Sequence, residues 1–168
     1  MSHGEKQSMR IGVLSDTHGN NANTQSALAV FEKLGAERLI HCGDWDTRDL
    51  LSLFSGWTLD FVFGNMDVDQ EAIRDAARLI GAECHGEFGA VRWAERRIAF
   101  LHGHRRRVLQ RTIASGEWDL VCWGHSHEPQ WERVGPTLVV NPGALHRVRV
   151  HTVALIDLAS LEVQHVCV

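Results

Sequence analysis

Residues 9–21 read Met-Arg-Ile-Gly-Val-Leu-Ser-Asp-Thr-His-Gly-Asn-Asn. Residues 9–15 form an apolar run with the length of a buried strand, and residues 16–21 form a polar loop. Asp16 and His18 therefore directly follow a strand. Because ligands of open α/β sheets bind just beyond the carboxyl ends of strands, this segment predicts an α/β fold with a site at one sheet edge.

The rest of the chain repeats this alternation of strands and amphipathic segments. Apolar residues recur at helical spacing over residues 23–34, and Gly35 follows where a helix C-terminus favours glycine. Asp46 or Thr47 is a suitable N-cap for a helix up to residue 54, and Asp69 caps the next one. Further helices are expected at residues 70–80 and 106–114, and strands at residues 38–42, 58–63, 90–94, 97–101, 119–123, 130–134, 138–140, 148–158 and 161–168.

The order of these elements predicts the fold class. Strand–helix units open the chain, and the part after residue 119 is rich in strands. This order favours an α/β domain with a two-layered sheet and helices outside. A length of 168 residues corresponds to one domain, which we place at residues 9–168 after a disordered polar tail over residues 1–8.

The composition excludes several classes of protein. A net charge of −4 argues against a strongly basic nucleic-acid binder. The chain has no apolar run of roughly 20 residues, as a membrane helix needs, and its polar start lacks the apolar core of a signal peptide. The cysteines are widely spaced and form no Cys-x-x-Cys pair, and Cys42 and Cys122 lie in apolar runs typical of buried strands. We therefore expect a cytoplasmic protein with free, buried thiols at Cys42, Cys84, Cys122 and Cys167.

Five of the expected strands end in an Asp, Asn or His, mostly beside a glycine. The chain holds 11 histidines, which makes metal chemistry the first hypothesis. Seven candidate ligands combine carboxylate, amide and imidazole groups, a donor set that suits Mn, Fe, Ni, Co or Zn in a hydrolytic site. Seven donors exceed what one tetrahedral ion takes, and they fit two ions that share a bridging carboxylate. The candidates are Asp16, His18, Asp44, Asn65, His102, His125 and His127.

These motifs resemble those of the calcineurin-like metallophosphoesterase superfamily. The shared order is Asp-x-His, Gly-Asp, Gly-Asn-x-Asp, His and Gly-His-x-His, between residues 16 and 127. Asn-Pro-Gly at residues 141–143 also resembles the small YfcE-like phosphodiesterases. The resemblance implies a single-domain αββα fold, a two-sheet β sandwich flanked by helices. It implies a phosphodiesterase of small phosphate esters, either nucleotide-type or other diesters.

The resemblance also implies a role for each ligand. In the family, Asp44 bridges two divalent metal ions, and a hydroxide between them attacks the phosphorus without a Ser or Cys nucleophile. Asp44 and Asn65 thereby count as catalytic as well as metal-binding. Manganese is the preferred expectation, with Ni, Fe, Co or Zn as alternatives. The remaining ligands form two sets, Asp16, His18 and His127 for one ion and Asn65, His102 and His125 for the other.

The sequence departs from the family at one position that matters for catalysis. Many relatives carry a His in the Gly-Asn-x-Asp motif, where it contacts phosphate and protonates the leaving group, but this chain has Met66. His104, close to His102, is our candidate replacement. Arg147 is either a substrate contact or a solvent-facing loop charge.

Several further residues have two interpretations each. Asp67 either orients a metal ligand or caps the next helix. The three arginines at residues 105–107 either form a solvated face or hold a polyanionic substrate. Trp45 and Trp123 either pack in the core or stack on a base. His41 is expected to be structural.

The sequence is also compatible with other functions. A catalytically weak or inactive interaction scaffold is the first, because a retromer subunit has the same fold and fold alone does not decide function. A nuclease is disfavoured by the charge and the length. We expect a small phosphate ester as the substrate, and no association with a membrane or with nucleic acid. The sequence is compatible with a homo-oligomer.

Overall fold

The computed structural model describes residues 8–168. The tail expected over residues 1–8 therefore lies outside the described residues, except for Ser8, which is exposed. Within the described residues, no helix combines the length and the apolar character needed to cross a bilayer.

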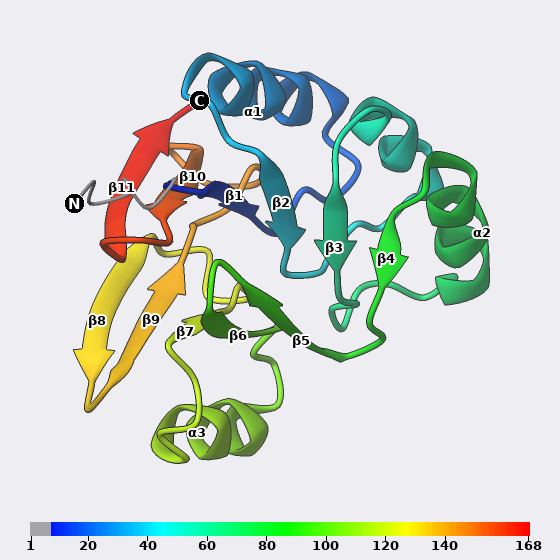
Figure 1. The fold of residues 1–168 in the computed structure, drawn as a ribbon. Coiled ribbons are helices and arrows are strands. Elements are labelled where there is room, and N and C mark those ends of the chain that lie inside the picture. Colours follow the sequence, from blue (N-terminus) through cyan, green and yellow to red (C-terminus); the bar gives the residue numbers. More distant parts are fainter. Residues whose placement is uncertain (1–7) are drawn as a thin grey trace.

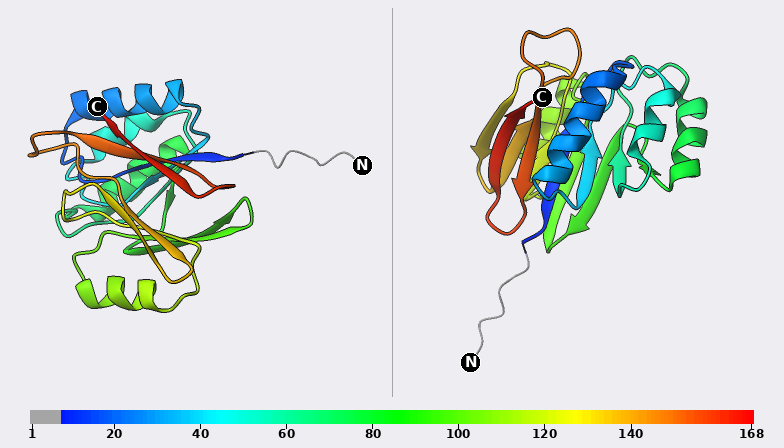
Figure 2. Two further views of the ribbon diagram at one scale, coloured as in Figure 1. Left: turned by 90° about the vertical axis from the view of Figure 1, so that its left-hand side faces the viewer. Right: turned by 90° about the horizontal axis from the view of Figure 1, so that it is seen from above.

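Two β-sheets pack face to face between layers of helix (Figures 1 and 2). The six-stranded sheet has the order β11-β10-β1-β2-β3-β4, and the five-stranded sheet has the order β5-β6-β7-β9-β8. The first sheet comprises β1 (Arg10–Leu14), β2 (Arg38–His41), β3 (Leu59–Phe61), β4 (Glu83–Cys84), β10 (Thr152–Asp157) and β11 (Glu162–Cys167). The second comprises β5 (Phe88–Trp93), β6 (Arg96–Leu101), β7 (Leu120–Cys122), β8 (Gln130–Val134) and β9 (Thr137–Asn141).

Helices cover the outer faces of both sheets. The left view of Figure 2 shows α1 on one side of the two sheets and α3 on the other. The first sheet is covered by α1, η1 and α2, and the second by α3. The αββα sandwich is therefore confirmed. The bounds are α1 (Asn21–Lys33), η1 (Arg48–Phe54), α2 (Gln70–Ile80) and α3 (Arg106–Ala114).

Three apolar cores separate the four layers. Side chains of a strand point alternately to opposite faces, so β1 contributes to two cores. Ile11 and Val13 pack against the second sheet, whereas Leu14 packs in the core beneath α1. The third core joins the second sheet to α3 through residues such as Val121 and Leu109.

The parallel strands determine where the loops meet. β1, β2 and β3 run parallel in one sheet, and β6, β7 and β9 run parallel in the other. The loops after these strands contain the predicted ligands, so the shared strand direction brings residues distant in sequence to one edge of the sandwich.

Several expected elements differ from the structure. The helices over 70–80 and 106–114 are confirmed, but the helix up to residue 54 is a 3-10 helix. Its N-cap is Thr47, whose side chain accepts from Asp49 N, so the alternative cap Asp46 is wrong. The strand expected from residue 148 begins only at Thr152, because residues 146–150 belong to a loop. β4 was not anticipated, since two residues carry no periodicity.

The four cysteines are free thiols. Cys42 and Cys122 are buried at the ends of β2 and β7, as expected. Cys84 is only partly buried and Cys167 is exposed, so the expectation of burial is wrong for these two. Both lie in short or edge strands, β4 and β11, which have little covering on one side.

Candidate metal centre

Donor atoms from four loops converge between the carboxyl ends of the strands. Asp16 and His18 follow β1, and Asp44 follows β2. His102 follows β6 and His127 follows β7 in the other sheet. Two groups have all their ligand atoms within 4.8 Å of one another: Asp16 with His18 and His127, and Asp16 with Asp44 and His102. The structure thus brings together five of the seven predicted ligands.

Each carboxylate has one oxygen held and the other directed inward. Asp16 Oδ2 accepts hydrogen bonds from Ser15 Oγ at 2.6 Å and from the backbone N–H of His125 at 3.0 Å. Its Oδ1 lies 3.0 Å from His127 Nε2. Asp44 Oδ1 accepts from the Met66 N–H at 2.9 Å, and Asp44 Oδ2 lies 3.2 Å from His102 Nε2. The free oxygens therefore point at imidazole nitrogens.

The imidazoles of His102 and His18 are held in the same manner. His102 Nδ1 lies 2.8 Å from the Cys42 carbonyl oxygen, and His18 Nδ1 lies 3.0 Å from Asp46 Oδ2. Both acceptors require a proton on Nδ1, which leaves Nε2 as the nitrogen that can bind a metal. His18 Nε2 lies 3.6 Å from Asp44 Oδ2 and 3.7 Å from Asp16 Oδ1.

Unpartnered buried atoms provide a direct test of whether a metal fits here. Asp16 Oδ1, His18 Nε2 and His102 Nε2 are buried and have no hydrogen-bond partner. An unsatisfied buried polar group costs about 1–3 kcal/mol, so a cluster of them needs a compensating ligand. A cation bound among carboxylate oxygens and neutral imidazoles supplies it. The residues therefore fit divalent metal ions.

The remaining two predicted ligands lie at the edge of this cluster. Asn65 is exposed and follows Gly64, where an added Cβ would lie 2.0 Å from Asp44 Oδ1. His125 is exposed, and its ring centroid lies 5.1 Å from that of His102. Both therefore border the Asp44–His102 side of the cluster.

The ligand loops carry backbone strain. Several non-glycine residues in them have a positive φ. Such conformations cost of order 1–3 kcal/mol each and cluster at functional sites. Interlocking backbone bonds hold them, such as Asp16 N to Gly43 O at 3.0 Å. The residues concerned are Asp16, His18, Asp44, Asp46, His125 and His127.

Asp67 organises the loop that carries Asp44. Its carboxylate accepts four backbone N–H groups, from Gly64 at 2.7 Å, Asp44 at 2.9 Å, Trp45 at 2.7 Å and Asp46 at 3.0 Å. The α2 helix is capped instead by the side chain of Asp69, which accepts from Ala72 N. The helix-cap interpretation of Asp67 is therefore wrong, and its contacts agree with the ligand-orienting one.

The residues next to the cluster have mainly structural roles. His41 is fully buried, accepts from Gly43 N at 3.1 Å through Nδ1 and stacks on Trp45 at 3.6 Å. Burial lowers the pKa of His41 to about 3, which keeps its imidazole neutral. Trp45 is fully buried against Phe54 and Phe61, so the interpretation in which it stacks on a base is wrong.

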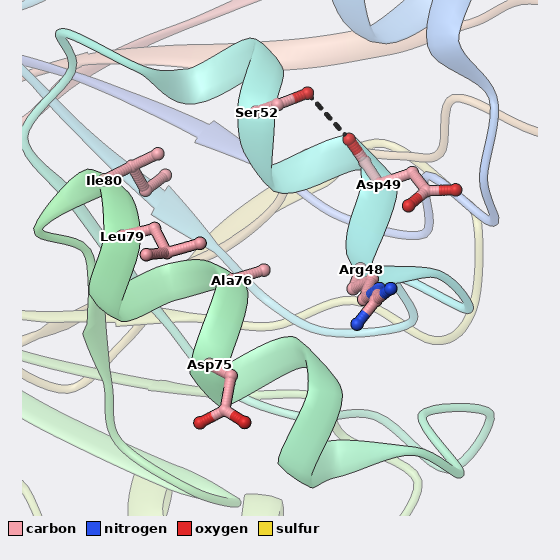
Figure 3. A pocket seen from close by; sticks show the side chains of 7 residues that line it. All are labelled: Arg48, Asp49, Ser52, Asp75, Ala76, Leu79 and Ile80. Carbon is pink, nitrogen blue, oxygen red and sulfur yellow. Dashed lines mark hydrogen bonds between the residues drawn. The ribbon is translucent and has the colours of Figure 1, made fainter.

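Three other features lie outside the ligand cluster. Arg105 pairs with Glu87 at 3.0 Å, while Arg106 and Arg107 are exposed, as on a solvated face. Trp123 is half-buried and packs against the core beneath α3. A groove of about 520 Å³ lies between η1 and α2 (Figure 3), and none of its lining residues is a predicted ligand.

Electrostatics in the cluster predict a pH dependence of metal binding. The Asp16 carboxylate, whose Oδ1 lies 3.7 Å from His18 Nε2, raises the pKa of His18 to about 9 against the opposing effect of burial, and Asp46 adds to this increase. Burial opposes ionisation of Asp16, but the nearby imidazoles of His127 and His18 hold the pKa of Asp16 well below its usual range. Below pH 9 the metal-free protein therefore holds a proton on His18 that a metal must displace.

We therefore expect metal binding at about pH 7.5 to release about one proton at His18. Because His18 binds that proton more completely as the pH falls, metal affinity should weaken by up to about tenfold per pH unit below pH 9. Calorimetric titrations of Mn²⁺ in buffers of different ionisation enthalpy measure the protons released. A binding enthalpy independent of the buffer would contradict this assignment.

Known proteins share this architecture. Residues 9–161 match the calcineurin-like phosphoesterase superfamily domain. Phosphodiesterase MJ0936 of Methanocaldococcus jannaschii is 29% identical over 163 residues, which cover 94% of this chain and 98% of that relative. A solved structure of an archaeal phosphodiesterase has a TM-score of 0.90 at 28% identity, and the match covers 95% of this chain and 100% of the archaeal chain. The structure of YfcE, a phosphoesterase from E. coli, has a TM-score of 0.65 at 18% identity over 94% and 98% of the two chains, which supports the fold.

These findings confirm the resemblance that the motifs indicate. The family match spans most of the chain, and the structural likeness extends over both sheets and their helices. The family implies divalent metal ions, and the Asp and His groups of this chain can bind them. The chain belongs to the calcineurin-like phosphoesterase superfamily and is an enzyme of that family, a metal-dependent phosphoric ester hydrolase.

Proposed function

We propose that this enzyme is a phosphodiesterase that uses two divalent metal ions to hydrolyse small phosphate diesters. The observation that carries the proposal is the cluster of buried carboxylate and imidazole atoms without partners. The relative of Methanocaldococcus jannaschii named as a phosphodiesterase supports the diester reaction. Manganese is our first expectation for the metal, and the cytoplasm is our expectation for the location.

The chain's own residues divide into two ligand sets in this proposal. Asp44 lies between them, because its Oδ2 faces both His102 Nε2 and His18 Nε2. When bound, the ions lower the pKa of water and neutralise charge that develops on the phosphoryl oxygens. The sets are Asp16, His18 and His127 on one side and Asn65, His102 and His125 on the other, as the family motifs imply.

The rim of the centre favours an open site for small substrates. Met66, whose N–H donates to Asp44 Oδ1, is 49% exposed and offers apolar contact to a leaving group, and Val68 in the same loop is 90% exposed. The ring of His146 lies 5.6 Å from that of His18, and Arg147 follows in a strained conformation with a φ of 55°. We propose that Arg147 contacts a phosphoryl oxygen, because a guanidinium binds such oxygens in a bidentate manner.

His104 is our candidate for the group that contacts the leaving oxygen. Its ring centroid lies 5.6 Å from that of His102 and 6.2 Å from that of His125, and its Nδ1 is buried without a partner. Burial and the neighbouring His102 lower the pKa of His104, so the neutral imidazole is favoured at neutral pH. A neutral imidazole still donates one N–H to a developing oxyanion.

We expect the His104→Ala variant to discriminate between leaving groups. Its kcat should fall about 10²-fold on an alkyl ester, whose leaving oxygen needs stabilisation, and less than about threefold on a p-nitrophenyl ester. Steady-state kinetics on both substrates measure the difference. Equal rates of variant and wild type on the alkyl ester would remove His104 from the reaction.

Metal reconstitution tests the proposed function as a whole. Metal-stripped protein should regain hydrolysis of bis(p-nitrophenyl) phosphate on addition of Mn²⁺, Ni²⁺, Co²⁺, Zn²⁺ or Fe²⁺, with much less turnover of p-nitrophenyl phosphate. An Asp44→Asn variant serves as the inactive control. If folded protein turns over neither ester with any metal, the proposal is wrong, and a binding scaffold becomes the leading function.

A further inference from the structure

We infer that Asp46 is a positioning residue that holds the His18 imidazole and makes the metal position beside His18 the tighter of the two. The inference rests on the proposed two-metal function and adds to it a residue outside the predicted ligand set. The local sequence pattern favours Asp46 only as a helix cap, a role that Thr47 fills.

The geometry at Asp46 is that of a carboxylate–imidazole–metal arrangement. Asp46 Oδ2 lies 3.0 Å from His18 Nδ1, and the His18 side chain is only 12% exposed. His18 Nε2, at the other end of the ring, is buried without a partner and faces Asp16 and Asp44. A carboxylate on Nδ1 sets the tautomer, fixes the ring and raises the basicity of the nitrogen that binds the metal.

The backbone of Asp46 is held for this contact. Its φ of 63° lies in the left-handed region, which costs free energy for a residue with a side chain. The Asp46 N–H donates to Asp67 Oδ1 at 3.0 Å, so the same carboxylate that organises the Asp44 loop also fixes Asp46. Among the described residues, His18 is the one hydrogen-bond partner of the Asp46 side chain. The strained conformation therefore serves the contact with His18.

His18 and His102 differ in the charge of the acceptors at their Nδ1 atoms. His102 Nδ1 donates to the neutral carbonyl of Cys42, whereas His18 Nδ1 donates to a carboxylate. His18 thus has a negative charge directly behind its ring, whereas His102 has a neutral acceptor there. Since that charge favours a cation electrostatically, the His18 position should bind its ion more tightly.

Calorimetric titration of metal-free protein with Mn²⁺ tests this inference directly. Wild type should show a tighter and a weaker class of site. Asp46→Ala should weaken the tighter class about 10–100-fold and the other less than about threefold. Asp46→Asn keeps an acceptor for His18 Nδ1 but removes the charge, so its affinity at the tighter class should lie between those of wild type and Asp46→Ala. Asp49→Asn is the matched control, because Asp49 is an exposed acid in the neighbouring η1.

Absorption spectra of Co²⁺-loaded protein give a second readout, because the visible bands of the ion would not change if Asp46 only stabilised the fold. Asp46→Ala should change the visible bands of the ion at the tighter position, while the melting temperature of the metal-free protein stays close to that of wild type. Equal weakening of both classes, or unchanged affinity and spectra, would overturn the inference.

The outcomes separate this inference from the proposed function. If one ion binds and Asp46→Ala still weakens it, the positioning role stands and the two-metal proposal fails. If two ions bind and support hydrolysis but Asp46→Ala binds both as wild type does, the positioning role fails alone. If no ion binds to folded wild type, both are wrong.

Discussion

The Asp44→Asn variant is expected to lose about 10³-fold or more in kcat on bis(p-nitrophenyl) phosphate, or about 4 kcal/mol of transition-state stabilisation. Asp44 Oδ2 lies 3.2 Å from His102 Nε2 and 3.6 Å from His18 Nε2, between the two ligand sets. An amide removes the negative charge and offers one weaker donor oxygen in place of a carboxylate that can bind two ions. Steady-state kinetics and metal stoichiometry by calorimetry check this expectation.

The fold should survive the Asp44→Asn change, because the amide oxygen of the new side chain would still accept the Met66 N–H that Asp44 Oδ1 accepts at 2.9 Å. Asp75→Asn is a suitable control, since Asp75 is 61% exposed on α2 and pairs only with Arg78 among the described residues. That variant should retain activity within about twofold. An Asp44→Asn enzyme with wild-type kcat and two bound ions would rule out Asp44 as the bridging ligand.

The Asp67→Ala variant is expected to lose about 3–5 kcal/mol of stability, because it leaves four backbone N–H groups without their acceptor. For a chain of 168 residues this corresponds to a fall of roughly 10 °C or more in melting temperature. The metal centre should weaken as well, since two of the four N–H groups belong to Asp44 and Asp46. Thermal unfolding of the metal-free protein isolates the effect on stability.

Asp69→Ala provides the comparison for Asp67→Ala. Asp69 lies two residues further on and accepts one N–H, from Ala72 at 3.1 Å, as the N-cap of α2. Its loss should cost about 1 kcal/mol and leave metal affinity unchanged. Asp67→Asn, which keeps one acceptor oxygen, should lie between wild type and Asp67→Ala. Equal losses for Asp67→Ala and Asp69→Ala would show that the four bonds contribute no more than one cap.

The sequence predicted the features that depend on hydrophobic periodicity and on the residues that follow strands. The strand over residues 10–14 leads directly into Asp16 and His18, and α2 and α3 follow their periodicity to the residue. Parallel strands bring such loop residues together at one edge, so their convergence could be predicted before any distance was known. The five candidate ligands that lie closest together could therefore be named from order and type alone.

The sequence was misleading where a residue's partner lies far along the chain. Asp46 matches a helix cap locally, but its carboxylate meets His18, 28 residues earlier. Trp45 lies beside a ligand in sequence and so invites a substrate contact, yet its ring is buried on His41. Local patterns depend on periodicity and propensity, and they contain no information on which residues far apart in the sequence come into contact.

The sequence by itself determined the α/β class, the order of most elements and the set of candidate ligands, because these follow from hydrophobic periodicity and from residues at strand ends, and the resemblance of the motifs to a known family added the αββα arrangement. Only the tertiary structure decided how those ligands are held: Asp16 by Ser15 and His125, Asp44 through Asp67, and His18 by Asp46. The physical reason is that hydrogen bonds depend on distances of about 3 Å between atoms that packing of the two sheets brings together.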